Sequence, residues 1–146
     1  MANPDSVGQN TQDSFGNFRI ANAGPVSIAA TGNAVVALPF LKGGTGGTGS
    51  YIIRRITVNN VSNTAGGTAP NCATANISVG TTSDGANLVT SNTVTTNLTG
   101  ANTFVDLTLA SAANSTSYTA NALFLNVNTN VANAAIFVSV YGDVQF

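Results

Sequence analysis

Carboxylates are the side chains of this chain best suited to acid–base chemistry, and all five of its acidic residues are aspartates. Two of Asp84, Asp106 and Asp143 would hydrolyse a glycoside if the fold brought them to a suitable separation. The chain has no tryptophan on which a sugar ring could stack. Asp106 and Asp143 also fall in strand-like segments, where a solvated carboxylate or an arginine partner is the simpler interpretation. An enzyme therefore requires Asp106 and Asp143 to meet in a cleft.

Two further features are superficially similar to chemical sites. Residues 43–49 are rich in glycine, but Lys42 precedes them and a strand-like segment follows, whereas a phosphate-binding loop leads into a helix N-terminus. We expect a flexible linker there. Cys72 is the only cysteine, so it can form no disulfide within the chain. It has no histidine or cationic neighbour to lower the pKa of its thiol, and we expect it to be inert.

The composition argues against most kinds of site. The 146 residues include no histidine and only four Lys+Arg, and 6% are charged whereas 43% are hydrophobic. We expect no catalytic residues, no metal site and no cofactor. A net charge of −1 provides no basic surface for nucleic acid or for an anionic membrane. A protein with so few charged residues tends to associate with other protein surfaces, so the composition indicates a structural protein that lies against a partner.

Hydrophobic alternation predicts strands over most of the chain and helix almost nowhere. The clearest strands are expected at 51–60, 73–80, 103–109, 123–127 and 136–141, with weaker ones at 15–20, 26–30, 34–40, 88–90 and 93–98. Residues 128–133 are expected to close a β-hairpin between the last two strands. About eight strands at this spacing predict an all-β, antiparallel sandwich of the jelly-roll type with negligible helix. This domain spans 15–146, behind a polar N-terminal arm at 1–14.

Two features indicate an interface. Arg54 and Arg55 are adjacent in a strand, so we expect them to point to opposite faces. One is expected at the rim of the core, with its stem over apolar residues and an Asp as its partner, and the other is either a second rim residue or part of a subunit contact. In the C-terminal hairpin, Phe124, Phe137 and Tyr141 alternate with the expected core residues and would line the opposite face. Cover from neighbouring loops of the same subunit is an equally good account of these aromatic residues.

Four segments carry a resemblance to a known family. They are YIIRRITVNNVS at 51–62, ATANISVG at 73–80, ALFLNV at 122–127 and IFVSVYGD at 136–143. Their order resembles the jelly-roll cement, or decoration, proteins of tailed bacteriophage capsids, over roughly residues 50–146. The resemblance implies a protein without enzymatic activity. It would form a homodimer or homotrimer, bind the major capsid protein on the outer surface of the virion, and be made in the cytoplasm of a bacterial host.

The interpretation from the sequence is thus a homo-oligomeric sandwich that stabilises a phage head by bridging capsid subunits. Residues 1–14 are too polar to fold alone, and Phe15 and Phe18 are expected to anchor the base of this arm to the sandwich or to a partner. The alternative is a carbohydrate-binding or tail-associated receptor-binding module. An exposed Tyr51, Tyr118 or Tyr141 beside a calcium site would favour that alternative.

Overall fold

The computed structural model describes residues 19–37, 49–93 and 98–145 of the chain. The expected arm at 1–14, with Phe15 and Phe18, and most of the glycine-rich segment lie outside the described residues. The described residues form strands without any helix, and none of them makes a helix long and apolar enough to cross a bilayer. The strands are β1 (Arg19–Ser27), β2 (Gly32–Ala37), β3 (Ser50–Asn63), β4 (Asn76–Gly80), β5 (Val89–Thr93), β6 (Phe104–Asp106), β7 (Ser117–Tyr118), β8 (Ala122–Thr129) and β9 (Ala134–Gln145).

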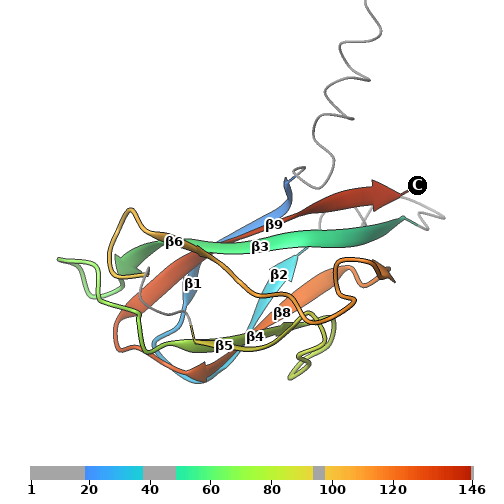
Figure 1. Cartoon of the computed structure of the whole chain (residues 1–146). Helices are drawn as coiled ribbons and strands as arrows, with labels where there is room; N and C mark the ends of the chain where they lie inside the picture. The colour runs from blue at the N-terminus through green and yellow to red at the C-terminus, as the bar shows by residue number, and fades with distance from the viewer. Residues whose placement is uncertain (1–18, 38–48, 94–97, 146) are drawn as a thin grey trace, which may run out of the picture.

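The strands pair into two antiparallel sheets that face each other (Figure 1). The first, which we call the β9 sheet, has the order β1-β9-β3-β6, and β7 also pairs with β3. The second, the β8 sheet, has the order β2-β8-β4-β5. The prediction of an all-β, antiparallel, two-sheet protein is confirmed. We call the solvent-facing side of each sheet the β9 face and the β8 face.

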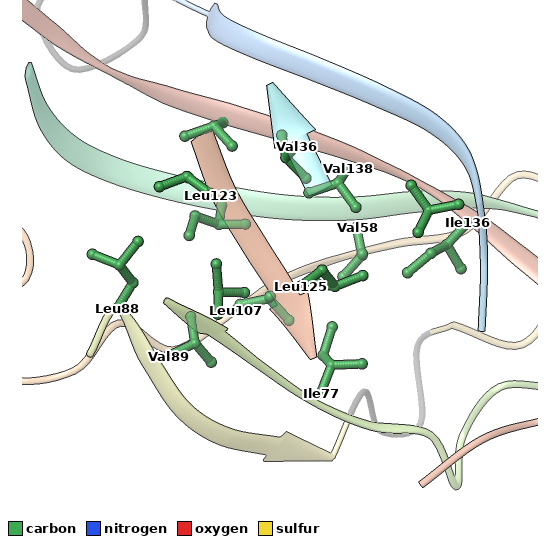
Figure 2. Close-up of a cluster of buried hydrophobic side chains, with 14 of the residues drawn as sticks. Val36, Val58, Ile77, Leu88, Val89, Leu107, Leu123, Leu125, Ile136 and Val138 are labelled. Carbon is green, nitrogen blue, oxygen red and sulfur yellow. The ribbon is translucent and has the colours of Figure 1, made fainter. Parts of the chain in front are cut away.

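The hydrophobic core fills the space between the two sheets. Successive side chains of a strand point to opposite faces, so the alternating apolar residues of each sheet meet in one layer. Figure 2 shows this layer, to which the β8 sheet contributes Leu123, Leu125 and Ile77 and the β9 sheet contributes Val138. Each of these side chains is at most 2% exposed. Burial of such side chains is the main stabilising contribution to the fold, at about 1.5–3 kcal/mol for each large aliphatic residue.

The expected C-terminal hairpin is wrong, because β8 and β9 belong to different sheets. The connection between them crosses the sandwich beside the connection from β1 to β2, and the two are hydrogen-bonded together. The amide of Val131 donates to the carbonyl of Ile28 at 3.0 Å, and the Asn130 side chain donates to the carbonyl of Ala29 at 2.9 Å. The alternation shows which residues face the core but not which strands pair, and both arrangements satisfy it.

Two β-bulges interrupt the pairing of β3 with β9. The register shifts between Ile53 and Arg55, and again between Asn59 and Ser62. The first shift makes Arg54 an extra residue opposite β9, so the inward-facing positions on either side of it are Ile53 and Ile56, both fully buried. Arg54 and Arg55 are therefore both kept out of the core, and the expectation that they point to opposite faces is wrong.

Candidate interaction surface

The β9 face gathers most of the residues expected at an interface. The strand register places Phe104 of β6, Asn59 of β3 and Phe137 of β9 in one row across this sheet. A second row contains Arg55 of β3, Tyr141 of β9 and Arg19 of β1. Residues directly opposite in an antiparallel pair have their side chains on the same face, so the sequence-distant members of each row lie side by side.

The aromatic row is only partly covered. Phe104 is 64% exposed, which makes it the most exposed large hydrophobic side chain among the described residues. Phe137 is half-buried because its ring lies against Gly24 of β1, where an added Cβ would come within 2.5 Å of the ring. Cover of Phe137 therefore comes from the same subunit, whereas Phe104 has no such cover. An exposed aromatic residue near arginine side chains is typical of an interface.

The arginine row is built around a tyrosine ring. The guanidinium carbon of Arg55 lies 4.3 Å from the ring centroid of Tyr141, within the range of a cation–π interaction. Its Nε is 4.0 Å from Asp106, too far for a hydrogen bond. Asp106 instead accepts a short hydrogen bond from the hydroxyl of Thr57. Arg19 pairs in register with Tyr141 from the other side and is exposed. The row thus presents two guanidinium groups on either side of Tyr141, and Asp106 of β6 lies in the neighbouring row, opposite Thr57.

Arg54 differs from Arg55 in being held within the subunit. Its Nε donates to Asp143 at 2.7 Å, and a second nitrogen donates to the carbonyl of Asn114 at 2.6 Å. These contacts tie the chain before β7 to β3 and β9. Of the two adjacent arginines, Arg55 is therefore the one whose side chain is better placed to contact a partner.

Phe124 does not join the other aromatic residues, because β8 lies in the opposite sheet. It is half-buried on the β8 face, in register with Val35 of β2 and Gly80 of β4. Val35 is 58% exposed and was not singled out by the sequence pattern. The residues expected to form one interface are thus divided between two faces: Arg54, Arg55, Phe137 and Tyr141 on one, and Phe124 on the other.

Most of the β8 face is occupied by hydrogen-bonded amides. Asn33 donates to Ser83 and to Asp84, both at 2.8 Å. Asn126 donates to the carbonyl of Gly85. Asn128 donates to Asn76 at 3.0 Å. Three of these hydrogen bonds, from Asn33 and Asn126, fix the turn between β4 and β5 over the sheet, so this part of the face is covered from within the subunit.

The residues considered for chemistry do not converge. Asp106 pairs in register with Thr57, and Asp143 pairs with Ile52 on the other side of β3. Their positions differ by about 13 Å along the strand alone, at ~3.3 Å per residue, whereas two glycosidase carboxylates lie at most ~9.5 Å apart. Among the described residues, no group of three Asp, Glu, His or Cys side chains is placed to hold a metal ion.

The remaining reactive groups are buried. Cys72 lies in the core, and burial raises the pKa of its thiol, which keeps it protonated. Tyr51 is fully buried, and its hydroxyl donates to the carbonyl of Ala120 at 2.8 Å. Burial, and to a lesser extent the neighbouring Tyr118, raises the pKa of Tyr51 above its ordinary value. Tyr51 is therefore not available as a stacking platform for a sugar.

Comparison with known protein families, with curated proteins and with solved structures finds no match to this chain.

The sequence pattern missed three exposed residues of these faces. Phe104 belongs to the strand expected at 103–109, but its exposure depends on β6 being the edge strand of its sheet. Arg19 lies at the end of an expected strand at 15–20, and its position beside Tyr141 follows only from the pairing of β1 with β9. Val35 belongs to a short apolar run whose edge position could not be predicted without the strand order.

Proposed function

We propose that this protein is a jelly-roll decoration protein that binds the outside of a bacteriophage capsid and stabilises it by bridging subunits of the major capsid protein. The strand order supports the jelly roll. When the two-residue β7 is set aside, eight strands remain, and the sheet orders β1-β9-β3-β6 and β2-β8-β4-β5 place the last strand between the first and the third. With β7 set aside, the chain changes sheet at every connection between consecutive strands except β4–β5. Two interleaved Greek keys produce this order.

The observation that carries the functional proposal is the composition of the β9 face. Phe104 is exposed in a row with Phe137, and Arg55 and Arg19 flank Tyr141 in the second row. Aromatic and arginine side chains are the two types most enriched in the residues that dominate protein–protein binding. The side chains that titrate near neutrality are absent from the chain, since it contains no histidine. The face therefore suits binding better than catalysis.

A decoration protein stabilises a shell through repetition of a moderate contact. A standard interface buries about 1,600 Å² in total, and one such contact per site needs no high affinity of its own. When a protein holds two neighbouring capsid subunits at once, their separation requires both contacts to break, so the effective affinity rises through avidity.

Co-sedimentation with empty heads tests the proposal. Heads of the virus that encodes the chain, assembled without it, are mixed with the purified protein, and the bound fraction is measured across a range of concentrations. Saturable binding at a fixed number of copies per head is expected. Phe104→Ser should weaken it by about tenfold, as for an aromatic hot spot. Thr90→Ala, which changes an exposed residue at the far edge of the β8 sheet, is the control and should bind normally.

Absence of saturable binding to heads, or equal binding of the Phe104→Ser variant and the unmodified protein, would contradict the proposal. Binding to cell-surface glycans in place of heads would favour the receptor-binding alternative.

A further inference from the structure

The four edge strands of the sandwich differ in how well they are protected from pairing with another chain. Sheet edges are normally blunted by bulges, proline, charge or short length. β1 has two register shifts, contains Pro25 and begins with Arg19. β6 is three residues long. β5 pairs with β4 through a register shift.

β2 has none of these protections. It pairs with β8 in continuous register from Gly32 to Ala37, over six residues that include neither proline nor a charged side chain. Among the described residues, the sheet order leaves one side of this strand without a neighbouring strand. The backbone donors and acceptors on that side form a regular row, which is the template that strand addition requires.

The side chains of β2 extend an apolar row to this edge. Gly80 of β4, Phe124 of β8 and Val35 of β2 are consecutive neighbours in register on the β8 face. The row ends at Val35, whose side chain is 58% exposed. Exposure of a β-branched residue at an uncharged edge is the combination that folded monomers usually avoid.

We propose that β2 pairs in antiparallel fashion with β2 of a second copy, with Val35 opposite Val35 at the two-fold axis. The pairing joins two four-stranded β8 sheets into one continuous sheet. The uncharged strand brings no like charges together, and the valine pair extends the apolar row from one Phe124 to the other. A second copy also matches the length, polarity and side-chain alternation of β2.

The register determines how the two copies are oriented. When Val35 lies opposite Val35, Asn33 lies opposite Ala37 and Ala34 opposite Val36, so residues of one face always meet residues of the same face. The two β8 sheets then continue with the same side facing outward, and both β9 faces lie on one side of the dimer. The interface is isologous and uses both copies of the edge, so association ends at two copies.

This pairing is a property of the isolated chain and does not depend on capsid binding. Sedimentation velocity of the purified protein over a range of concentrations is expected to show a reversible monomer–dimer equilibrium and no larger species. Val35→Asp places two carboxylates opposite each other at the axis and should raise the dimer dissociation constant at least tenfold. Thr90→Asp adds the same charge at an exposed position on the opposite edge of the same sheet, and should leave the dimer dissociation constant unchanged.

Cysteine cross-linking tests the register itself. Val35→Cys should form an intermolecular disulfide under mild oxidation, because directly opposed residues of an antiparallel pair have Cα atoms about 4.5–5.5 Å apart, which a disulfide can span. Asn33→Cys, two residues away on the same face, should not, since its counterpart lies opposite residue 37. The native Cys72 is buried and serves as an internal control for nonspecific oxidation.

A monomer at all concentrations, a closed trimer, equal loss of association in Val35→Asp and Thr90→Asp, or cross-linking of Asn33→Cys in preference to Val35→Cys would each overturn the proposed pairing. Because these experiments contain no capsid, their failure is separate from a failure of the proposed function.

Discussion

The β8 face is covered by a turn that is hydrogen-bonded to it, whereas the β9 face leaves an aromatic ring and an arginine side chain exposed. Asn33 and Asn126 of the β8 face both donate to the turn between β4 and β5. The β9 face instead leaves Phe104 and Arg19 exposed and holds Arg55 through a tyrosine ring. Both faces cover the same core, so the difference concerns what each face is able to contact.

The described charges follow the same division. Arg19, Arg55 and Asp106 lie on the β9 face, and Arg54 and Asp143 form an ion pair along it. Asp84, in the turn over the β8 face, accepts a hydrogen bond from Asn33. A chain with few charges has thus placed its arginines together on one sheet. Because the charged residues are so few, their position on one sheet tells more about where a partner binds than about the solubility of the protein.

The largest expected effect tests how tightly the β8 face is covered. Gly80→Ala adds a Cβ that would collide with the backbone of Gly85, so the turn must move away from the sheet. We expect a loss of about 2–3 kcal/mol in the free energy of unfolding, as for other overpacked sites. Urea denaturation measures it. Gly100→Ala is the control, because an added Cβ there meets nothing within 4 Å. Equal stability of the two variants would show that the turn is not packed on the sheet.

A smaller effect compares one amide on each face. Asn126→Ala removes the donor to the carbonyl of Gly85 from a side chain that is 6% exposed, and should cost about 1–2 kcal/mol. Asn59→Ala, at a half-buried position of the β9 face, should change the free energy of unfolding by less than about 0.5 kcal/mol. Thermal unfolding of both variants provides the measurement. A larger loss in Asn59→Ala would reverse the comparison.

The two arginine–aspartate pairs of the β9 sheet should differ in coupling. Alanine double-mutant cycles are expected to give about 0.5–1 kcal/mol for Arg54 with Asp143, joined at 2.7 Å. For Arg55 with Asp106, at 4.0 Å, they should give close to zero. The first value should decrease at high salt because both side chains are partly exposed. Equal couplings would mean that Arg55 is held as firmly as Arg54.

The smallest effect on stability is expected at the most exposed aromatic residue. Phe104→Ser removes little buried surface, so the free energy of unfolding should change by less than about 0.5 kcal/mol. The same variant is expected to bind capsids about tenfold more weakly. Unfolding and co-sedimentation measured on one preparation separate the two outcomes. A marked loss of stability would identify Phe104 as part of the fold instead of a contact residue.

Alternation in the sequence was sufficient to predict the strand-rich fold and the inward-facing residues. Leu123, Leu125, Ile136 and Val138 face the core as expected, because burial of alternate residues depends only on the period of a strand. The partners of each strand could not be predicted this way. β8 and β9 have the pattern of a hairpin, and their assignment to separate sheets depends on contacts with β2, β3 and β4, which are distant in the chain.

Local irregularities of the strands were the second feature that the sequence pattern did not predict. The bulge at Arg54 could not be predicted from the sequence. Two adjacent polar residues are compatible with a regular strand, so their presence does not indicate an extra residue. The two-residue β7 has no pattern of its own, and it forms because Tyr118 lies opposite Tyr51 of β3. Of the candidate interface, the alternation identified the outward positions of Phe137 and Tyr141. Their separation from Phe124 required the strand order.

The bulges of β3 also determine where this strand can change length. The side chains of β3 alternate between the two faces with a period of two residues, and this alternation is shifted by one residue twice, at Arg54 and near Asn60. Deletion of Arg54 would remove the surplus residue and leave Ile53 and Ile56 facing inward. Deletion of Thr57 would make Ile56 and Val58 neighbours, so one of them would point into water. Natural insertions and deletions in β3 should therefore be confined to its two bulges, while the length between them stays constant.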